Sequence, residues 1–151
     1  MAREISEIDP TDAERHRAAT SRLVRVFKVA GRIDSDSPYA VLNLSDQTAL
    51  ERIGGAPAIM RDVAQELGSA LSTATTVVDR LVKKGLVRRD RDESNRRIVR
   101  LALTDEGAHL LGRLIQEQLA SSATILAALT LPERQTYLAL HEKIAKTFDN
   151  T

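Results

Sequence analysis

The 151-residue sequence contains neither cysteine nor tryptophan, and aromatic residues make up only 3% of it. The absence of cysteine excludes disulfides, thiolate nucleophiles, thiol redox sensors and cysteine-based zinc sites. With so few aromatic residues, alanine and aliphatic side chains must build the core, which favours packed helices over a sandwich of strands. No apolar run approaches the roughly 18 residues of a membrane-spanning helix, and the first residues lack a signal-peptide pattern. We therefore expect a cytoplasmic protein that does not contact membranes.

The charged residues are unevenly distributed, although the net charge is only +1. Nine basic and three acidic residues lie between Arg80 and Arg100, a local charge of +6, whereas the rest of the chain has 13 basic and 18 acidic residues, or −5. A short positive segment in an otherwise acidic chain is typical of a surface that binds a polyanion. A solvated charged hairpin would have the same composition, so charge alone leaves both interpretations open.

Capping residues, glycines and hydrophobic periodicity predict a mainly α chain of one domain, residues 1–151, with a small two-stranded β-wing. We expect helices at residues 10–30, 45–53, 59–67, 72–84, 105–129 and 130–148. Ser45 and Thr104 are predicted caps, and Thr130 to Glu133 form a predicted capping box. The strands are expected at residues 86–89 and 98–103, with residues 91–95 as the turn between them and residues 32–44 as a loop.

Two short helices, a turn at Gly68 and a basic hairpin together form the plan of a winged helix-turn-helix. Projected at 100° per residue, the second of these helices has an apolar face that consists of Leu71, Ala74, Val77, Val78 and Leu81. Its opposite face consists of Ser72, Thr73, Thr76, Arg80 and Lys83, with Thr75 near the boundary. Short hydroxyl side chains allow close approach to base edges and cations neutralise phosphates, so this face suits a DNA major groove. An ordinary exposed helix surface is the alternative, although such surfaces more often use Glu, Lys and Ala.

Three motifs lie in the segment from Leu67 to Gly107. The first consists of Leu67-Gly68, Ser72-Thr73, Val78-Asp79-Arg80-Leu81 and Lys83-Lys84-Gly85-Leu86-Val87. The second is Asp92-Glu93-Ser94-Asn95-Arg96-Arg97, and the third is Leu103-Thr104-Asp105-Glu106-Gly107. In this order they resemble the recognition helix, the wing tip and the start of the following helix in the MarR family of multiple-antibiotic-resistance-type regulators.

This resemblance implies a homodimer in which helices 10–31 and 105–149 form the dimer contact and residues 45–104 form the winged helix-turn-helix. It also implies a palindromic operator in double-stranded DNA, no cofactor, and a small phenolic or other aromatic effector that releases a repressor. The family's wing arginine, which enters the minor groove, corresponds to Arg97, and its neighbour corresponds to Arg96. We add Arg88 and Arg89 of the hairpin as predicted DNA contacts. The candidate effector-binding residues are His16, Tyr39, Val41 and Leu42.

Three positions depart from the family pattern. Asn95 stands where the family usually has Asp, so a neutral hydrogen bond would replace the salt bridge that orients the wing arginine. Thr76 occupies a place often held by Arg, which changes the expected base preference. Ala70-Leu71 replaces the usual Ser-Pro pair and removes the family's N-cap, so we expect Ser69 or Ser72 to supply the cap.

Three other functions fit parts of the sequence less well. An enzyme or a metal site is disfavoured, because His16, His109 and His141 lie on separate predicted helices and the sequence has no HExxH, nucleophile elbow or glycine-rich phosphate loop. A winged helix that binds only proteins would need no basic hairpin. A nonspecific architectural DNA-binding protein would share the basic segment, and competition with unrelated duplex would distinguish it from a site-specific regulator.

Overall fold

The computed structural model describes residues 8–30, 37–91 and 99–149, and the chain divides into two compact units, residues 1–43 and 44–151. The first unit contains α2 (Pro10–Ala30) and the short α3 (Pro38–Val41). The Asp9 carboxylate begins α2 by accepting a hydrogen bond of 2.7 Å from the backbone N–H of Thr11. The predicted first helix is therefore confirmed, and the predicted loop that follows it contains one short helix.

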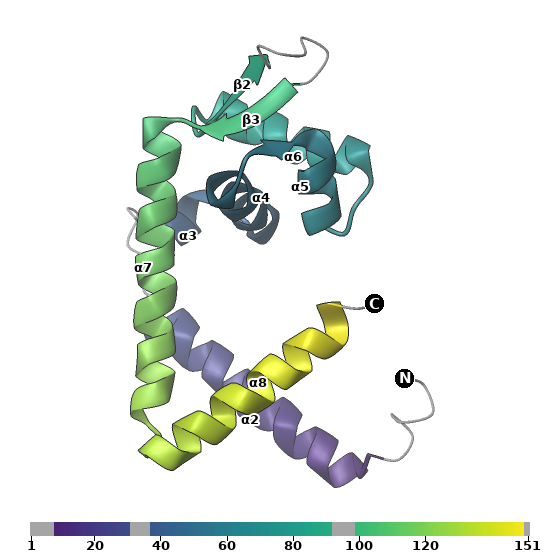
Figure 1. The fold of residues 1–151 in the computed structure, drawn as a ribbon. Coiled ribbons are helices and arrows are strands. Elements are labelled where there is room, and N and C mark those ends of the chain that lie inside the picture. Colours follow the sequence, from purple (N-terminus) through teal and green to yellow (C-terminus); the bar gives the residue numbers. More distant parts are fainter. Residues whose placement is uncertain (1–7, 31–36, 92–98, 150–151) are drawn as a thin grey trace. The chain divides into compact units, whose positions relative to one another are not determined.

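The second unit is a helical body with a small antiparallel sheet. Its elements are α4 (Leu44–Gly55), β1 (Ala58–Ile59), α5 (Met60–Glu66), α6 (Leu71–Lys83), β2 (Val87–Arg91), β3 (Val99–Leu103), α7 (Asp105–Ala127) and α8 (Leu131–Asp149) (Figure 1). The mainly helical class with an antiparallel wing is confirmed. The sheet has a third strand, in the order β1-β3-β2, because Ala58 pairs with Leu101 on the other edge of β3. Two residues give no periodicity, so the sequence did not predict β1.

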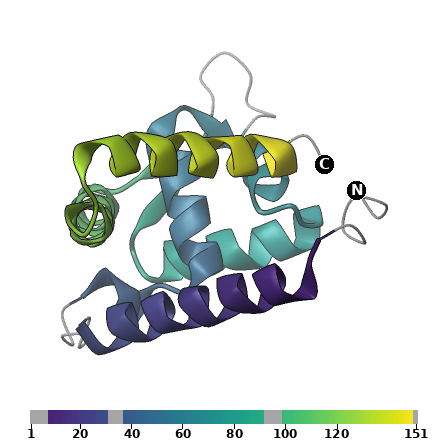
Figure 2. The ribbon, with the colours of Figure 1, turned by 90° about the horizontal axis from the view of Figure 1, so that it is seen from below.

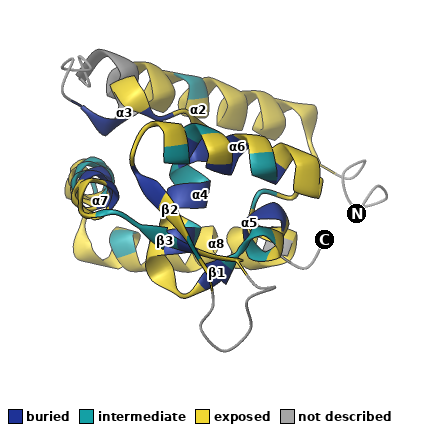
Figure 3. Ribbon diagram, turned by 90° about the horizontal axis from the view of Figure 1, so that it is seen from above, coloured by how far each residue is buried: buried dark blue, intermediate teal, exposed yellow. Residues whose placement is uncertain are grey.

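The core of the second unit lies around α4, which packs against α5, α6, α7 and β3. Leu50 of α4, Val63 of α5, Val78 and Leu81 of α6 and Leu114 of α7 are completely buried. Figure 3 shows these elements with buried positions where they meet and exposed positions on their outer sides. This packing fixes the direction of α6 relative to the hairpin.

A tight joint connects the start of α7 to the end of α6. The Thr104 hydroxyl accepts a hydrogen bond of 3.0 Å from Gly107 N and donates one of 2.6 Å to Gly85 O, so the predicted Thr104 cap is confirmed. Thr104 N donates to Leu86 O at 3.1 Å. A Cβ atom on Gly107 would overlap the same Leu86 carbonyl, so this close approach requires glycine. Figure 2 looks along α7 from the end at which α8 leads away.

Three local predictions at helix starts are wrong. Ser45 does not cap α4, because this helix begins one residue earlier, at Leu44. Neither Ser69 nor Ser72 caps α6, since its N-cap is Ala70, which has no side-chain acceptor, and Ser72 already lies within the helix. The Ser69 hydroxyl is buried and has no partner in the described part of the chain. Leu71 is 56% exposed and does not join the apolar face, because the core contacts of α6 begin one turn later, at Ala74.

Candidate nucleic-acid interface

Helices α5 and α6 form a helix-turn-helix around Gly68. The glycine has a φ of +54°, a left-handed conformation that other residues rarely adopt. Gly68 N donates to Gln65 O and Ser69 N donates to Ala64 O, each at 3.0 Å, which closes the end of α5. The turn therefore delivers the chain to the start of α6 in a fixed direction.

The two faces of α6 differ in burial much as the helical projection predicts. The buried side chains are Ala74, Val77, Val78 and Leu81. Ser72, Thr73, Thr76 and Lys83 are exposed, while Thr75 and Arg80 are half-buried. The face predicted to contact DNA is therefore the outward one, and Lys83 has no ion pair within the described residues.

Buried Asp46 holds two cations at the C-terminal end of α6. Its side chain, on α4, is only 1% exposed. One carboxylate oxygen accepts hydrogen bonds of 2.8 and 2.6 Å from Nε and Nη2 of Arg80, and the other accepts one of 3.1 Å from Nζ of Lys84. Burial alone would raise the pKa of Asp46, but the hydrogen bonds and positive charges of the two cations outweigh it and lower this pKa. Asp46 is therefore a carboxylate, and the cluster keeps a net charge of +1 with both cations about one-third exposed.

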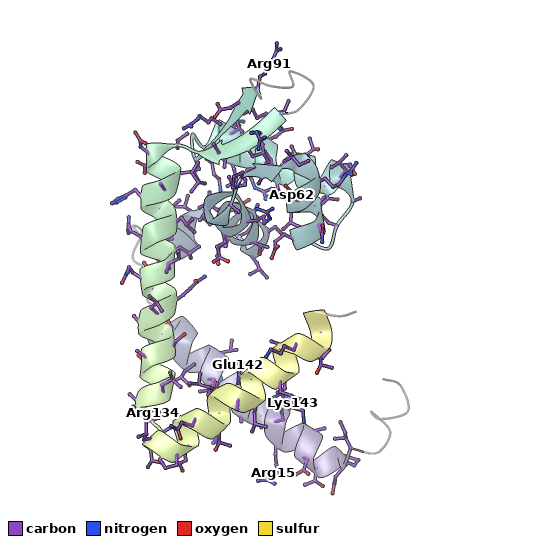
Figure 4. All side chains as sticks on the ribbon, in the orientation of Figure 1. Arg15, Asp62, Arg91, Arg134, Glu142 and Lys143 are labelled. Carbon is purple, nitrogen blue, oxygen red and sulfur yellow. The ribbon has the colours of Figure 1, made fainter. Side chains whose placement is uncertain are left out.

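Two of the predicted hairpin contacts make ion pairs inside the protein. Arg88 donates to Asp90 at 2.8 Å and to the Leu103 carbonyl at 3.0 Å. Arg89 donates to Asp79 of α6 at 2.5 Å, which ties β2 to this helix. Arg91, at the end of β2, is exposed and points away from the helices (Figure 4). The positive charge of the hairpin is thus partly used to hold the hairpin against α6.

Comparison with known proteins finds a MarR-like segment within the chain. Residues 48–99, which run from α4 to the start of β3, match the model of the MarR family. Over these residues the chain is similar to the MarR family. The HTH-type transcriptional regulator PecS of Dickeya dadantii (strain 3937) is 35% identical over 79 residues, which cover 52% of this chain and 48% of PecS. The chain spans about half the length of the curated relatives that it matches.

Solved structures share the fold across most of the chain. FabT of Streptococcus pneumoniae, solved in complex with DNA, has a TM-score of 0.78 at 22% identity, and the match covers 91% of this chain and 97% of FabT. BpsR of Bordetella bronchiseptica, whose DNA binding is regulated by 6-hydroxynicotinic acid, has a TM-score of 0.62 at 22% identity. The match covers 88% of this chain and 91% of the BpsR chain. At this identity the likeness establishes a MarR-like fold, and function must be argued from the residues.

The remaining predicted site residues fall into two groups. The wing-tip residues Arg96 and Arg97 lie outside the described residues, as does Asn95. The candidate effector-binding residues all belong to the first unit: His16 of α2 and Val41 of α3 are exposed, Leu42 is 3% exposed, and Tyr39 lies in α3 with a side chain outside the described part. Adjacent Val41 and Leu42 therefore differ in burial, which suits a packing role for Leu42.

Sequence reasoning missed the acidic partners of the predicted DNA contacts. Asp46 precedes Arg80 by 34 residues, and Asp79 precedes Arg89 by 10, so neither pair shows a helical or strand spacing. The only signal in the sequence is an Asp within the first turn of a short helix, which by itself is typical of a favourable interaction with the helix dipole. Within the part of the chain that the structure describes, no group of three or more His, Asp or Glu side chains could hold a metal ion. No helix in that part is both long and apolar enough to cross a membrane.

Proposed function

We propose that this protein is a transcriptional regulator that binds double-stranded DNA as a homodimer at a palindromic operator. The observation that carries the proposal is the outward face of α6, with Ser72, Thr73 and Thr76 exposed near its start and Lys83 exposed at its end. In a helix-turn-helix, the start of the second helix reads base edges while cations contact the backbone. FabT, which has a similar fold, was solved in complex with DNA, and this supports DNA binding by the present chain.

The exposed apolar residues of the terminal helices support a homodimer. These residues are 41% to 64% exposed, and they are Leu23 and Val24 of α2, Ile115 and Leu119 of α7, and Leu138, Leu140, Ile144 and Phe148 of α8. Apolar surface on three helices is unfavourable in water, and a second copy of the chain would cover it. We therefore retain residues 10–31 and 105–149 as dimerisation helices, with residues 45–104 as the DNA-binding region. Twofold symmetry would then place two copies of α6 about one turn of DNA apart.

Selection from a random duplex pool, followed by fluorescence anisotropy at several salt concentrations, tests the proposal. We expect an inverted-repeat site that binds roughly a thousandfold more tightly than unrelated duplex, with an affinity that falls steeply as salt rises. Lys83→Ala and Arg91→Ala should weaken binding and each reduce the salt slope by roughly two, about one for each half-site. Lys143→Ala removes an exposed charge from α8 and serves as the matched control, provided that sedimentation shows the same oligomeric state as the wild type.

Three results would contradict this proposal. A chain that sediments as a monomer and shows no salt-sensitive binding to any duplex is not an operator-binding dimer. Equal weakening by the α8 control and by the α6 variant would show that the measured binding does not use α6. Equal affinity for every duplex would instead indicate an architectural DNA-binding protein.

We further propose that the protein is a repressor released by a small aromatic or phenolic effector. The regulation of BpsR by 6-hydroxynicotinic acid supports this chemistry. Such an effector acts by preferring a dimer in which the two copies of α6 are wrongly spaced for the operator. A panel of hydroxylated aromatic acids should contain a compound that raises the melting temperature and weakens operator binding. If no compound does both, an aromatic effector is the wrong assignment.

A further inference from the structure

The DNA-facing side of α6 is less able to donate hydrogen bonds than its composition suggests. The Thr75 hydroxyl donates to Leu71 O at 2.8 Å, and the Thr76 hydroxyl donates to Ser72 O at 3.1 Å. A threonine hydroxyl has a single hydrogen, so both can then only accept a hydrogen bond from a base. Two of the four hydroxyl residues on this helix are thus unavailable to acceptors such as guanine O6, N7 or thymine O4.

Leu71 adds a large apolar side chain to the same surface. It is the first residue of α6 and is 56% exposed, while Ser72 and Thr73 beside it are also exposed. The helix begins there because Ala70 is extended, with φ −63° and ψ 151°, which leaves Leu71 one turn ahead of the buried Ala74. If α6 enters the major groove, the side chains at its N-terminal end contact the base edges. Leu71 would then be an apolar side chain among these contacts.

We propose that Leu71 selects a thymine in each half-site by packing against its C5-methyl group. Among the four standard bases, thymine presents an apolar methyl group in the major groove. Contact between this methyl group and a leucine side chain removes apolar surface from water, which is favourable. This proposal rests on the proposed operator binding and adds that Leu71 recognises thymine. Neighbouring Ser72 and Thr73 are polar, and exposed Lys83 adds a positive charge at the other end of the helix, so this face suits a nucleic-acid groove better than an apolar protein partner.

Replacement of thymine by deoxyuridine removes only the methyl group and tests this contact directly. In the selected operator, each thymine is replaced in turn in both half-sites, and affinities are measured for the wild type, Leu71→Ala, Leu71→Met and the control Leu44→Ala. Leu44 likewise begins a helix and is 77% exposed, but it lies on α4. One methyl in apolar contact corresponds to about a fourfold change in affinity, and two half-sites to about fifteenfold.

We expect one symmetric pair of thymines at which the wild type, Leu71→Met and Leu44→Ala lose about fifteenfold and Leu71→Ala loses little. Leu71→Ala should melt at the temperature of the wild type, because the side chain is more than half exposed and alanine favours the helix. If the wild type and Leu71→Ala respond alike to every replacement, or if the selected operator has no such thymine, the inference is wrong although operator binding stands. If the wild type binds no duplex specifically, the proposed function fails and the inference fails with it.

Discussion

We expect Asp46→Asn to destabilise the protein more than the same Asp→Asn change in any other ion pair described above. The 1% exposed carboxylate accepts three charge-assisted hydrogen bonds from Arg80 and Lys84. Removal of one partner from a buried ion pair costs about 3–5 kcal/mol. Both cations keep about a third of their side-chain surface and regain water when the charge is lost, and the amide oxygen still accepts from Arg80. We therefore expect Asp46→Asn to lower the free energy of unfolding by about 2–3 kcal/mol.

Urea unfolding at a fixed protein concentration is the appropriate assay. Guanidinium is a salt and would screen the interaction under test. If the protein is a dimer, its apparent stability depends on concentration, so every variant must be compared at the same one. Asp90→Asn is the matched control: the side chains of Asp90 and Arg88 are 46% and 56% exposed, and loss of this pair should change stability by about 0.5 kcal/mol or less.

A double-mutant cycle between Asp46→Asn and Arg80→Met separates the ion pair from other effects of either change. Because the two side chains are in direct contact, the coupling energy should be about 1–3 kcal/mol. An unfolding midpoint for Asp46→Asn close to that of Asp90→Asn, or additive losses in the cycle, would refute the conclusion that this carboxylate joins α4 to α6.

Three further predictions concern the same unit. The pKa of Asp46 in the folded protein lies below its ordinary value of 3.8, so the stabilisation by this carboxylate is complete above that value and is lost as pH falls through the folded-state pKa. The difference in stability between the wild type and Asp46→Asn should therefore shrink below about pH 4 in acid-urea titrations. A constant difference would argue against an ionised Asp46. Gly107→Ala should lower the free energy of unfolding by about 3 kcal/mol or more, because the added Cβ overlaps a backbone carbonyl. Gly112→Ala, whose Cβ meets no atom within 4 Å, should leave the melting temperature equal or higher. Similar melting temperatures for the two variants would disprove the close approach at Gly107. Thr104→Val should lower the free energy of unfolding by about 1 kcal/mol through loss of the cap, and Thr124→Val near the C-terminal end of α7 should have a smaller effect by thermal denaturation.

The helices and the hairpin were predictable because local signals specify them. The apolar spacing of α6 predicts its buried and exposed faces, and Thr104 followed by acidic residues predicts the start of α7. The errors concern ends and partners. Leu71 has the spacing of a core residue, but the core stops one turn short of it, which depends on how far α4 extends beneath α6. The ion pairs of Asp46 and Arg89 depend on contacts between elements, and periodicity carries no information about these.

The joint at Thr104 makes α7 a lever. Three contacts fix the first turn of this helix to the corner at Gly85 and Leu86: the cap, the backbone hydrogen bond and the close approach of Gly107. A helix of 23 residues is about 35 Å long, so a tilt of a few degrees imposed at its far end rotates the whole corner, with α6 and the hairpin attached. In the proposed dimer, the proposed effector would therefore need to alter only the angle between the two copies of α7, and the proposed DNA-binding surface could keep its structure while it moves out of register with the double helix.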